Sequence, residues 1–381
     1  MRFLIFFSVV LLVFGSVGYY IYLRLSQSFF NSNHSPLAIT FFYWFLAISL
    51  FLGYILQSLT INIFSESLVK LGSFMIGVLA YGLIAIVFLD ILRLINHFIP
   101  FFPDFVSRNY IGFKFYLGII TAISIFSLVI YGYFHAVDTK IVDLEIKIDK
   151  KNTLTEPIYI VALSDIHLGT IINHKNLDKL FEKINKLNPD IVLIGGDLVD
   201  NSFKVAEHYK LLERFKELKP KYGIYSCLGN HDYISRSFEH IDEFNKNGIN
   251  ILRDTSILIN DSFYIIGRDD VPSNSIAGHH RKSLDHLIKN IDTTKPIILL
   301  DHQPFNLDSV AKYPVDFQFS GHTHKGQFFP FSLVTKLIFE KDYGFVKKEN
   351  TNFYISSGFG NAVSPIRIGT QSEIVNIKLT N

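Results

Sequence analysis

Cysteine is almost missing from this chain: Cys227 is the only one in 381 residues. A single cysteine cannot form an internal disulfide, so a disulfide framework is excluded. Basic residues barely outnumber acidic ones, 36 against 34, and this balance gives no charge excess of the kind that binds nucleic acid. Internal repeats and low-complexity tracts are also missing, which argues against repeat and fibrous architectures.

Charge is scarce in the first third of the chain, where only nine charged residues precede residue 135. Four apolar runs in this stretch are long enough to cross a bilayer as helices, which takes about 20 residues. The runs are approximately 3–23, 37–59, 68–95 and 113–134. The first is too long for a signal peptide, and three more follow it. The sequence therefore predicts four transmembrane helices within residues 1–135.

Basic residues near the ends of these runs predict the orientation. Four of them flank the first and third connecting loops and two flank the other face: Arg24, Arg93, Arg108 and Lys114 against Arg2 and Lys70. Cytoplasmic loops of membrane proteins carry the excess of Lys and Arg. We therefore predict a multi-pass protein of a bacterial inner membrane, with the rest of the chain outside the cytoplasm. Asp90 lies three residues before Arg93, and this spacing predicts an ion pair near the membrane interface. The alternative, an ion relay, is disfavoured.

The pattern changes after residue 135. Residues 141–149 alternate apolar and charged side chains, as a half-buried strand does, and we assign residues 136–155 to a linker with this one strand. Strands and helices then alternate through residues 156–381. Helices are predicted at about 173–188, 203–218, 237–247 and 281–291, and strands begin near residues 158, 191, 223, 251, 263, 297, 317, 353 and 374. So many strands predict two packed sheets flanked by helices.

Five short motifs in this second part carry carboxylates, imidazoles and one carboxamide. They are SDIHLG at 164–169, GGDLVD at 195–200, GNHD at 229–232, LDHQP at 300–304 and GHTH at 321–324. Each follows an apolar run that predicts a strand. Strand ends that meet at one edge of a sheet are where α/β proteins build their active sites. We therefore expect the five motifs to converge.

The residue types in these motifs suit a pair of divalent metal ions. Two ions about 3.5–4 Å apart can hold the attacking and the leaving oxygen of a displacement at phosphorus. Mixed nitrogen and oxygen ligation fits Mn, Fe or Zn. The candidate ligands are Asp165, His167, Asp197, Asn230, His302, His322 and His324. The pattern favours a metal-dependent phosphoesterase.

His231 and Asp232 are left over from this set of ligands. The Asp232 carboxylate, next to His231 in the chain, could hold the imidazole or keep it protonated, and a protonated imidazole serves as a general acid. We therefore predict catalytic roles for both residues. Asp200 is interpreted as a loop-stabilising carboxylate, and residues 279–281 are placed outside the site.

The motifs D-x-H, G-D, G-N-H-D, a later His and G-H-x-H together resemble the calcineurin-like metallophosphoesterase superfamily over residues 156–381. The resemblance implies a four-layer α/β/β/α sandwich. The ligand sets that it implies are Asp165, His167, Asp197 and His324 for one ion and Asp197, Asn230, His302 and His322 for the other. A hydroxide bridging the ions would attack phosphorus, and His231 would protonate the leaving oxygen.

The apolar first part and the closing stretch 354–379 look most similar to one membrane-associated subgroup of this superfamily. It includes the YkuE and YaeI types and transmembrane proteins that carry this domain. In that subgroup the last motif often continues with Gly-Gly-Gln, whereas Lys325 replaces the first glycine here. Lys325 either contacts substrate phosphate or points into solvent, and we favour solvent. Gly358, Gly360 and Asn361 are expected to shape a loop beside the metals.

Three classes of function are weighed. The first is an integral-membrane phosphoesterase acting on a phosphoester or pyrophosphate of a lipid-linked substrate. Relatives act on UDP-2,3-diacylglucosamine in lipid A assembly, so the resemblance makes a pyrophosphatase of that type a specific version. The second is a membrane sensor or scaffold that binds metal without turnover. The third, a transporter with a regulatory domain, is disfavoured because the predicted spans carry almost no intramembrane polar residues beyond Asp90, which lies near an end. We favour the first.

Overall fold

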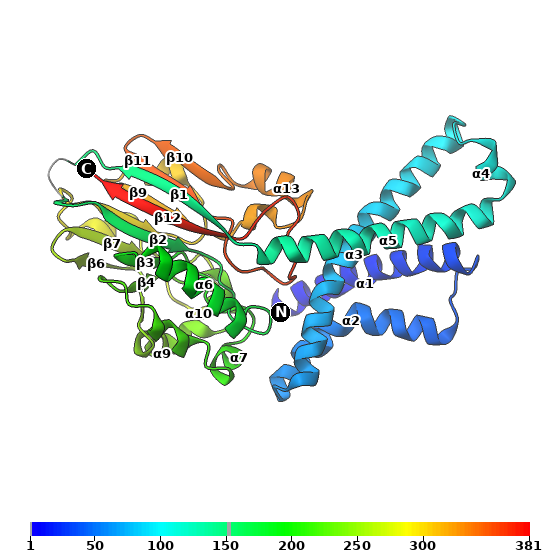
Figure 1. Ribbon diagram of the computed structural model, residues 1–381, viewed down its shortest axis with the longest axis horizontal. Coiled ribbons are helices and arrows are strands. Elements are labelled where there is room, and N and C mark those ends of the chain that lie inside the picture. Colours follow the sequence, from blue (N-terminus) through cyan, green and yellow to red (C-terminus); the bar gives the residue numbers. More distant parts are fainter. Residues whose placement is uncertain (1, 151–153) are drawn as a thin grey trace. The chain divides into compact units, whose positions relative to one another are not determined.

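The computed structural model describes residues 2–150 and 154–381, except for the side chains of residues 2–7, 9 and 10. Two compact units make up the chain, Met1–Tyr133 and Phe134–Asn381. We call them the helical unit and the sheet unit (Figure 1).

Apolar helices make up the helical unit. They are α1 (Arg2–Phe29), α2 (Leu37–Leu59), α3 (Ile63–Phe98), the short α4 (Asp104–Arg108) and α5 (Tyr110–Val137), whose last residues belong to the sheet unit. Among the described residues, α2, α3 and α5 are long and apolar enough to cross a membrane. The first predicted span falls in α1, several of whose side chains lie outside the described ones, so a fourth span stays a prediction.

The strands of the sheet unit form two six-stranded mixed sheets. In spatial order, the first sheet contains β1 (Lys140–Lys147), β12 (Glu373–Thr380), β2 (Ile158–Leu163), β3 (Ile191–Ile194), β4 (Ile224–Ser226) and β5 (Ile249–Ile251). The second contains β10 (Gly344–Lys348), β11 (Thr351–Ile355), β9 (Phe317–Ser320), β8 (Ile297–Leu300), β7 (Phe263–Gly267) and β6 (Thr255–Ile259). Strands β2 to β5 run parallel to one another, and so do β7, β8, β9 and β11. The carboxyl ends of these strands therefore meet at one edge of each sheet.

Helices and loops surround the two sheets. The helices of this unit are α6 (His174–Leu187), α7 (Phe203–His208), η1 (Leu212–Glu217), α8 (Asn230–Ile234), η2 (Ser237–His240), α9 (Ile241–Lys246), α10 (Ser273–Ala277), α11 (Leu284–Ile288), α12 (Leu307–Val310), η3 (His324–Gly326) and α13 (Phe331–Ile338). Helix α6 begins where predicted, because the Asn173 side chain accepts a hydrogen bond from the backbone N–H of Lys175 and so caps the first turn. The helix predicted over 203–218 is divided into α7 and η1, since Lys210 between them has a left-handed backbone with φ 51°.

Alternating side chains along β2 explain the layers. Val161 and Leu163 belong to a buried cluster with Leu180 of α6, whereas Ile160 and Ala162 pack in a cluster shared with the second sheet. Successive side chains of a strand point to opposite faces, so one strand contributes to both layers. A third cluster joins the outer face of the second sheet to α11 and α12. The predicted α/β unit with two mixed sheets is confirmed.

Candidate metal centre

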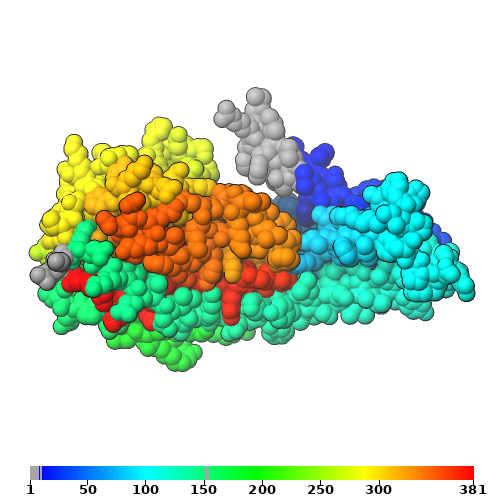
Figure 2. Space-filling view, turned by 90° about the horizontal axis from the view of Figure 1, so that it is seen from above, coloured from blue at the N-terminus to red at the C-terminus, as the bar shows by residue number. Residues whose placement is uncertain are grey.

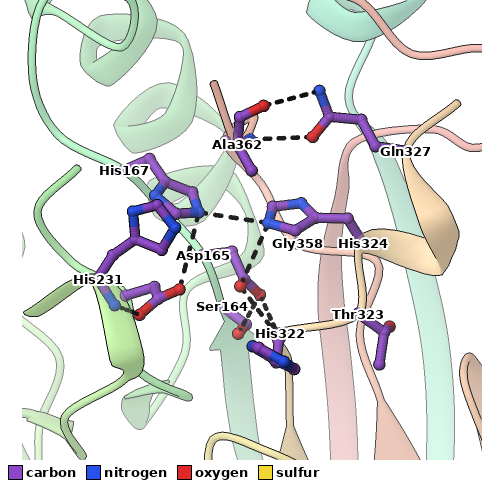
Figure 3. Close-up of polar contacts among 12 residues, drawn as sticks. Ser164, Asp165, His167, His231, His322, Thr323, His324, Gln327, Gly358 and Ala362 are labelled. Atoms are coloured by element: carbon purple, nitrogen blue, oxygen red, sulfur yellow. Dashed lines mark hydrogen bonds and ion pairs between the residues drawn. The ribbon is translucent and has the colours of Figure 1, made fainter. Parts of the chain in front are cut away.

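Each of the five motifs begins where a strand ends. The strands β2, β3, β4, β8 and β9 end within four residues before the first candidate ligand of the motif that follows them. These strands come from both sheets, and the structure brings all seven candidate ligands into two adjoining groups. Figure 3 shows the imidazoles of His167, His231 and His324 and the carboxylate of Asp165 close together.

The first group consists of Asp165, His167 and His324, whose ligand atoms all lie within 4.8 Å of one another. His167 Nε2 lies 3.3 Å from His324 Nε2, and that nitrogen lies 3.4 Å from Asp165 Oδ1 (Figure 3). All three side chains are buried. Two imidazole nitrogens facing each other beside a buried carboxylate are stabilised by a cation between them, and the mixed donor set suits a first-row divalent metal.

The second group surrounds the side-chain oxygen of Asn230. His302 Nε2 lies 3.2 Å from Asn230 Oδ1 and 3.2 Å from Asp197 Oδ2, and His322 Nδ1 lies 2.7 Å from Asn230 Oδ1. His302 Nδ1 is 2.7 Å from the carbonyl oxygen of Gly195. A carbonyl can only accept, so Nδ1 donates to it, and Nε2 is the ring nitrogen that faces the group and could bind a metal.

Asp197 connects the two groups. Its Oδ2 lies 3.2 Å from His302 Nε2 in the second group and 3.9 Å from His167 Nε2 in the first. Burial raises the pKa of the Asp197 carboxyl, but the imidazoles of His302 and His231 outweigh it and hold the pKa well below its usual value. The Asp197 carboxylate is therefore ionised at neutral pH and in a position to be shared.

Most of the candidate ligands have an unusual backbone conformation. Five of the seven lie in the left-handed region: Asp165 (φ 53°), His167 (φ 54°), Asp197 (φ 54°), His322 (φ 72°) and His324 (φ 46°). Such a conformation costs a non-glycine residue about 1–3 kcal/mol and is found at functional sites, where surrounding structure enforces it. The loops at the strand ends are therefore held in the shape that directs these side chains inward.

Asp200 is the carboxylate that accompanies His231. Asp200 Oδ1 lies 3.5 Å from His231 Nδ1 and 3.5 Å from His167 Nδ1. Burial lowers the pKa of the His231 imidazole, but Asp200 and Asp197 outweigh this effect and raise the pKa to about 9. His231 is thus protonated at neutral pH, and Asp200 orients a candidate ligand as well. Asp200 was expected only to stabilise its loop, so this position is a departure from the sequence interpretation.

Asp232 has different partners from those expected. Its carboxylate accepts hydrogen bonds from the backbone N–H of Gly229 at 2.9 Å and of Val199 at 3.2 Å, and from the Ser237 hydroxyl at 3.1 Å. These bonds tie the loops after β3 and β4 together. The support that we predicted Asp232 would give to the His231 ring comes in the structure from Asp200.

Arg367 is a fully buried cation beside the first group that the sequence analysis did not single out. Its Nη2 lies 3.3 Å from His324 Nδ1 and donates to the carbonyl of Gly358 at 3.0 Å. Its Nε donates to Asn361 Oδ1 at 2.9 Å. Arg367 therefore holds the late loop, whose Gly358 and Asn361 were expected beside the metals. A lone arginine in a stretch rich in Ser and Gly was the available signal.

Lys325 and the residues before α11 lie outside the two groups. The Lys325 ammonium sits 4.6 Å from the centre of the Tyr343 ring, and the residue is partly exposed. Its φ of 51° explains why glycine suits this position. His279 Nδ1 lies 2.8 Å from Asp269 Oδ2, and Arg281 Nη2 donates to Asp301 Oδ1 at 2.6 Å.

The absence of a side chain at Gly321 allows the first group to form. A Cβ at this position would lie 1.6 Å from Ser164 Oγ and 2.3 Å from Asp165 Oδ2. We expect Gly321→Ala to displace the Asp165 carboxylate and to weaken Mn²⁺ binding, measured by calorimetric titration, by about 10–100-fold or more, as loss of ligand orientation does. Gly169→Ala is the control, because its Cβ would meet only Asp200 Cβ at 3.6 Å. Equal affinity in both variants would contradict the argument.

Asp270 gives the unit a pH-dependent stability. Burial raises the pKa of this fully buried carboxyl to about 6 from 3.8. Because the pKa of Asp270 is higher in the folded than in the unfolded chain, its protonation stabilises the fold. This contribution is complete below about pH 3.8 and is lost as the pH rises through 6. The free energy of unfolding of Asp270→Asn should therefore exceed that of the wild type. The difference should grow from pH 4.5 to 7 and reach about 3 kcal/mol. Thermal unfolding of both proteins in EDTA checks this, and a difference independent of pH would contradict it.

Comparisons with known proteins agree with the geometry of the site. Residues 158–326 match the family model described as calcineurin-like phosphoesterase. An uncharacterized metallophosphoesterase of Campylobacter jejuni is 30% identical over 100% of this chain and 99% of its own length. An uncharacterized metallophosphoesterase of Aquifex aeolicus is 32% identical over 67% of this chain and 98% of its own.

A zebrafish (Danio rerio) transmembrane protein with metallophosphoesterase domain is 33% identical over 68% of this chain. The match covers 61% of that protein, which is less than two thirds of its length. The matched family model ends after the G-H-T-H motif and contains all seven candidate ligands. The chain carries apolar helices of membrane-spanning length in front of this region. It belongs to the calcineurin-like metallophosphoesterase family, whose members are metal-dependent hydrolases of phosphoesters.

Proposed function

We propose that the sheet unit hydrolyses a phosphoester or pyrophosphate of a lipid-linked substrate at the membrane, using two divalent ions. The observation that carries the catalytic part is the position of Asp197 between two groups of donors, next to a protonated His231. Asp165, His167 and His324 would hold one ion, and Asn230, His302 and His322 the other, with Asp197 shared. Bound ions would supply charge to the phosphoryl group and activate a water molecule.

His231 is proposed as the general acid. Its backbone N–H donates to Asp197 Oδ1 at 2.7 Å, which fixes the residue beside the shared carboxylate. Asp200 keeps the imidazole protonated, and the ring packs 4.6 Å from the ring of His167. A protonated imidazole at this place can give its proton to the leaving oxygen of the ester, a contribution typically of about 10²–10⁴-fold in rate.

An exposed apolar surface near the second group supports a lipid-linked substrate. Helix α13, which is described throughout, buries none of its residues. Its exposed apolar side chains are Phe331, Leu333, Val334, Leu337 and Ile338. In Figure 2 the segment around α13 lies at the molecular surface, in orange. Exposed apolar patches mark surfaces that bind lipid or protein.

Phe339 connects this surface to the candidate metal centre. It follows α13 in the chain, and its ring lies 5.8 Å from that of His322 and 5.0 Å from that of Phe305. Acyl chains covering α13 would therefore place a phosphate next to the second group of donors. The chain also carries apolar helices of membrane-spanning length, which would tether the sheet unit to the membrane that holds such a substrate.

Leu337→Glu tests this part of the proposal, because Leu337 is 87% exposed and its replacement leaves no cavity. We expect turnover of a vesicle-embedded lipid phosphate to fall about tenfold or more, since a charge on an apolar binding face costs more than 1.4 kcal/mol. Turnover of soluble p-nitrophenyl phosphate should stay within about twofold by the same argument. Phe345→Glu on β10, another exposed apolar position, is the control. Equal losses on both substrates would rule out a lipid-binding role for α13.

The reaction itself is tested with a panel of phosphoesters and Mn²⁺. The intact chain in bilayers is assayed on a phosphomonoester, a phosphodiester and lipid pyrophosphates, including UDP-2,3-diacylglucosamine. We expect hydrolysis that depends on Mn²⁺ and is fastest with one lipid-linked member. Full occupancy by metal without hydrolysis of any member would favour the alternative, a sensor or scaffold that binds metal without turnover.

A further inference from the structure

A large cavity lies within the helical unit. It has a volume of about 1100 Å³ and is lined by α1, α2, α3 and α5. Most of its wall is apolar, with side chains such as Leu46, Val78 and Ile125. Ligand cavities of proteins are typically about 300–1,000 Å³, so this one has room for a large apolar molecule.

Charged residues line one end of the cavity, and they do not balance. The charged lining residues, among those that the structure describes, are Arg24, Asp90, Arg93 and Lys114. Asp90 pairs with Arg24 at 2.6 Å and with Arg93 at 3.3 Å. The pair between Asp90 and Arg93 that the sequence predicted is therefore present, and a second cation shares the same carboxylate. Three cations against one anion leave the cavity with a positive end.

The cations keep donor capacity for a further anion. Arg24 Nη1 donates to a neutral oxygen, Gln27 Oε1, at 2.8 Å. Among the described residues, Lys114 Nζ donates to two neutral oxygens, Asn31 Oδ1 at 2.9 Å and the Gln27 carbonyl at 3.2 Å. Hydrogen bonds from cations to phosphate oxygens are stronger than those to neutral acceptors. A phosphate at this end would replace these neutral acceptors with charged ones and offset the excess positive charge.

With α3 and α5 across a bilayer, the charged end would lie at one of its faces. The four residues stand near the end of α1, near the end of α3 and near the start of α5. Lys114 and Tyr133, where α5 leaves this unit, are separated by about 28 Å at 1.5 Å per helical residue. This span nearly equals the hydrocarbon thickness of a bilayer, about 30 Å. A phosphate bound near Lys114 therefore lies in the leaflet opposite to the face at which the chain leaves the membrane.

We infer that the helical unit binds one phospholipid with an anionic headgroup, its phosphate at Arg24, Arg93 and Lys114 and its acyl chains along the apolar wall. Because the headgroup lies in the opposite leaflet, this lipid is a bound partner and not the substrate of the sheet unit. A net positive end favours an anionic headgroup over a zwitterionic one.

Native mass spectrometry of the full chain, delipidated in detergent, tests the inference. We expect phosphatidylglycerol to bind at one per chain and at least about fivefold tighter than phosphatidylcholine with the same acyl chains. The double variant Arg93→Gln, Lys114→Gln should lose this preference. Lys70→Gln is the matched control, because Lys70 also lies on α3 but pairs with Glu66 at 3.0 Å and is outside the cavity. Turnover of a soluble phosphoester should be the same in the wild type, the double variant and the Lys70 variant.

A second variant tests the apolar wall. Ala122→Phe places a ring in the cavity and should reduce binding of both lipids. Phosphatidylcholine bound as tightly as phosphatidylglycerol, or an equal loss in the Lys70 variant, would overturn the inference, since the cations would then act only through general surface charge. Glycerol 3-phosphate binding as tightly as the intact lipid would also overturn it, because the acyl chains would then play no part.

Discussion

Replacing Asp197 by alanine is expected to abolish both metal binding and hydrolysis. Asp197 is the carboxylate that lies near His167 in one group of donors and His302 in the other, so its loss should lower the occupancy of both ions. Bound ions contribute several kcal/mol to phosphoryl transfer, so kcat/KM should fall by about 10³-fold or more. Elemental analysis after gel filtration measures the metal content, and the assay panel measures the rate.

The matched control is Asp178→Ala. Asp178 is an exposed carboxylate on α6 that pairs with Arg214 at 2.7 Å, and its loss should change neither quantity. Circular dichroism must show that both variants fold, because Asp197 also accepts a hydrogen bond from the His231 backbone. A folded Asp197→Ala protein that keeps two ions would show that the shared ligand has been assigned to the wrong residue.

His231→Ala should separate catalysis from metal binding. The His231 ring faces Asp200 and packs on His167, and these three residues form a further cluster of possible ligand atoms. His231 lies in neither of the two groups to which the ions are assigned. With an alkyl phosphoester, kcat should fall by about 10²–10⁴-fold, the usual contribution of a general acid. With p-nitrophenyl phosphate the loss should be much smaller, because a good leaving group needs no proton. Metal content should stay at the wild-type value.

Asp200→Asn extends this test to the residue that holds the ring. Without the Asp200 carboxylate the imidazole loses the hydrogen-bonding partner that most raises its pKa. Assayed at saturating Mn²⁺, because Asp200 also contacts His167, the variant should show the same dependence on the leaving group as His231→Ala, in a weaker form. Release of the metals by His231→Ala would instead make His231 a ligand, and equal losses with both leaving groups would exclude it as the acid.

The architecture and the membership of the site were accessible from the sequence for a physical reason. Metal ligands are polar and lie in loops just outside the core. They therefore follow apolar strands within a few residues, as Asp165 follows β2 and His302 follows β8. The mixed two-sheet unit and the three apolar helices α2, α3 and α5 were predicted on the same basis. Long apolar runs and strand-end polar residues are local signals.

Contacts between distant loops were not accessible in this way. Asp200 and Asp232 are both acidic residues near candidate ligands, and only the fold shows that Asp200 reaches His231 while Asp232 binds backbone N–H groups. Arg367 lies 43 residues beyond its partner His324. Helix α13 was missed although its apolar residues Leu333, Val334, Leu337 and Ile338 recur at helical spacing. In the fold this apolar face is exposed and does not pack in the core.

The left-handed backbone at five candidate ligands implies a trade-off between thermal stability and catalytic activity. Glycine tolerates these dihedral angles without the penalty that Asp165 or His322 incurs. Glycine at His322 (φ 72°) would thus relax the loop while discarding a donor. A laboratory selection for heat resistance alone would then enrich inactive proteins, and a selection that preserves turnover would have to find its stabilising changes elsewhere in the chain.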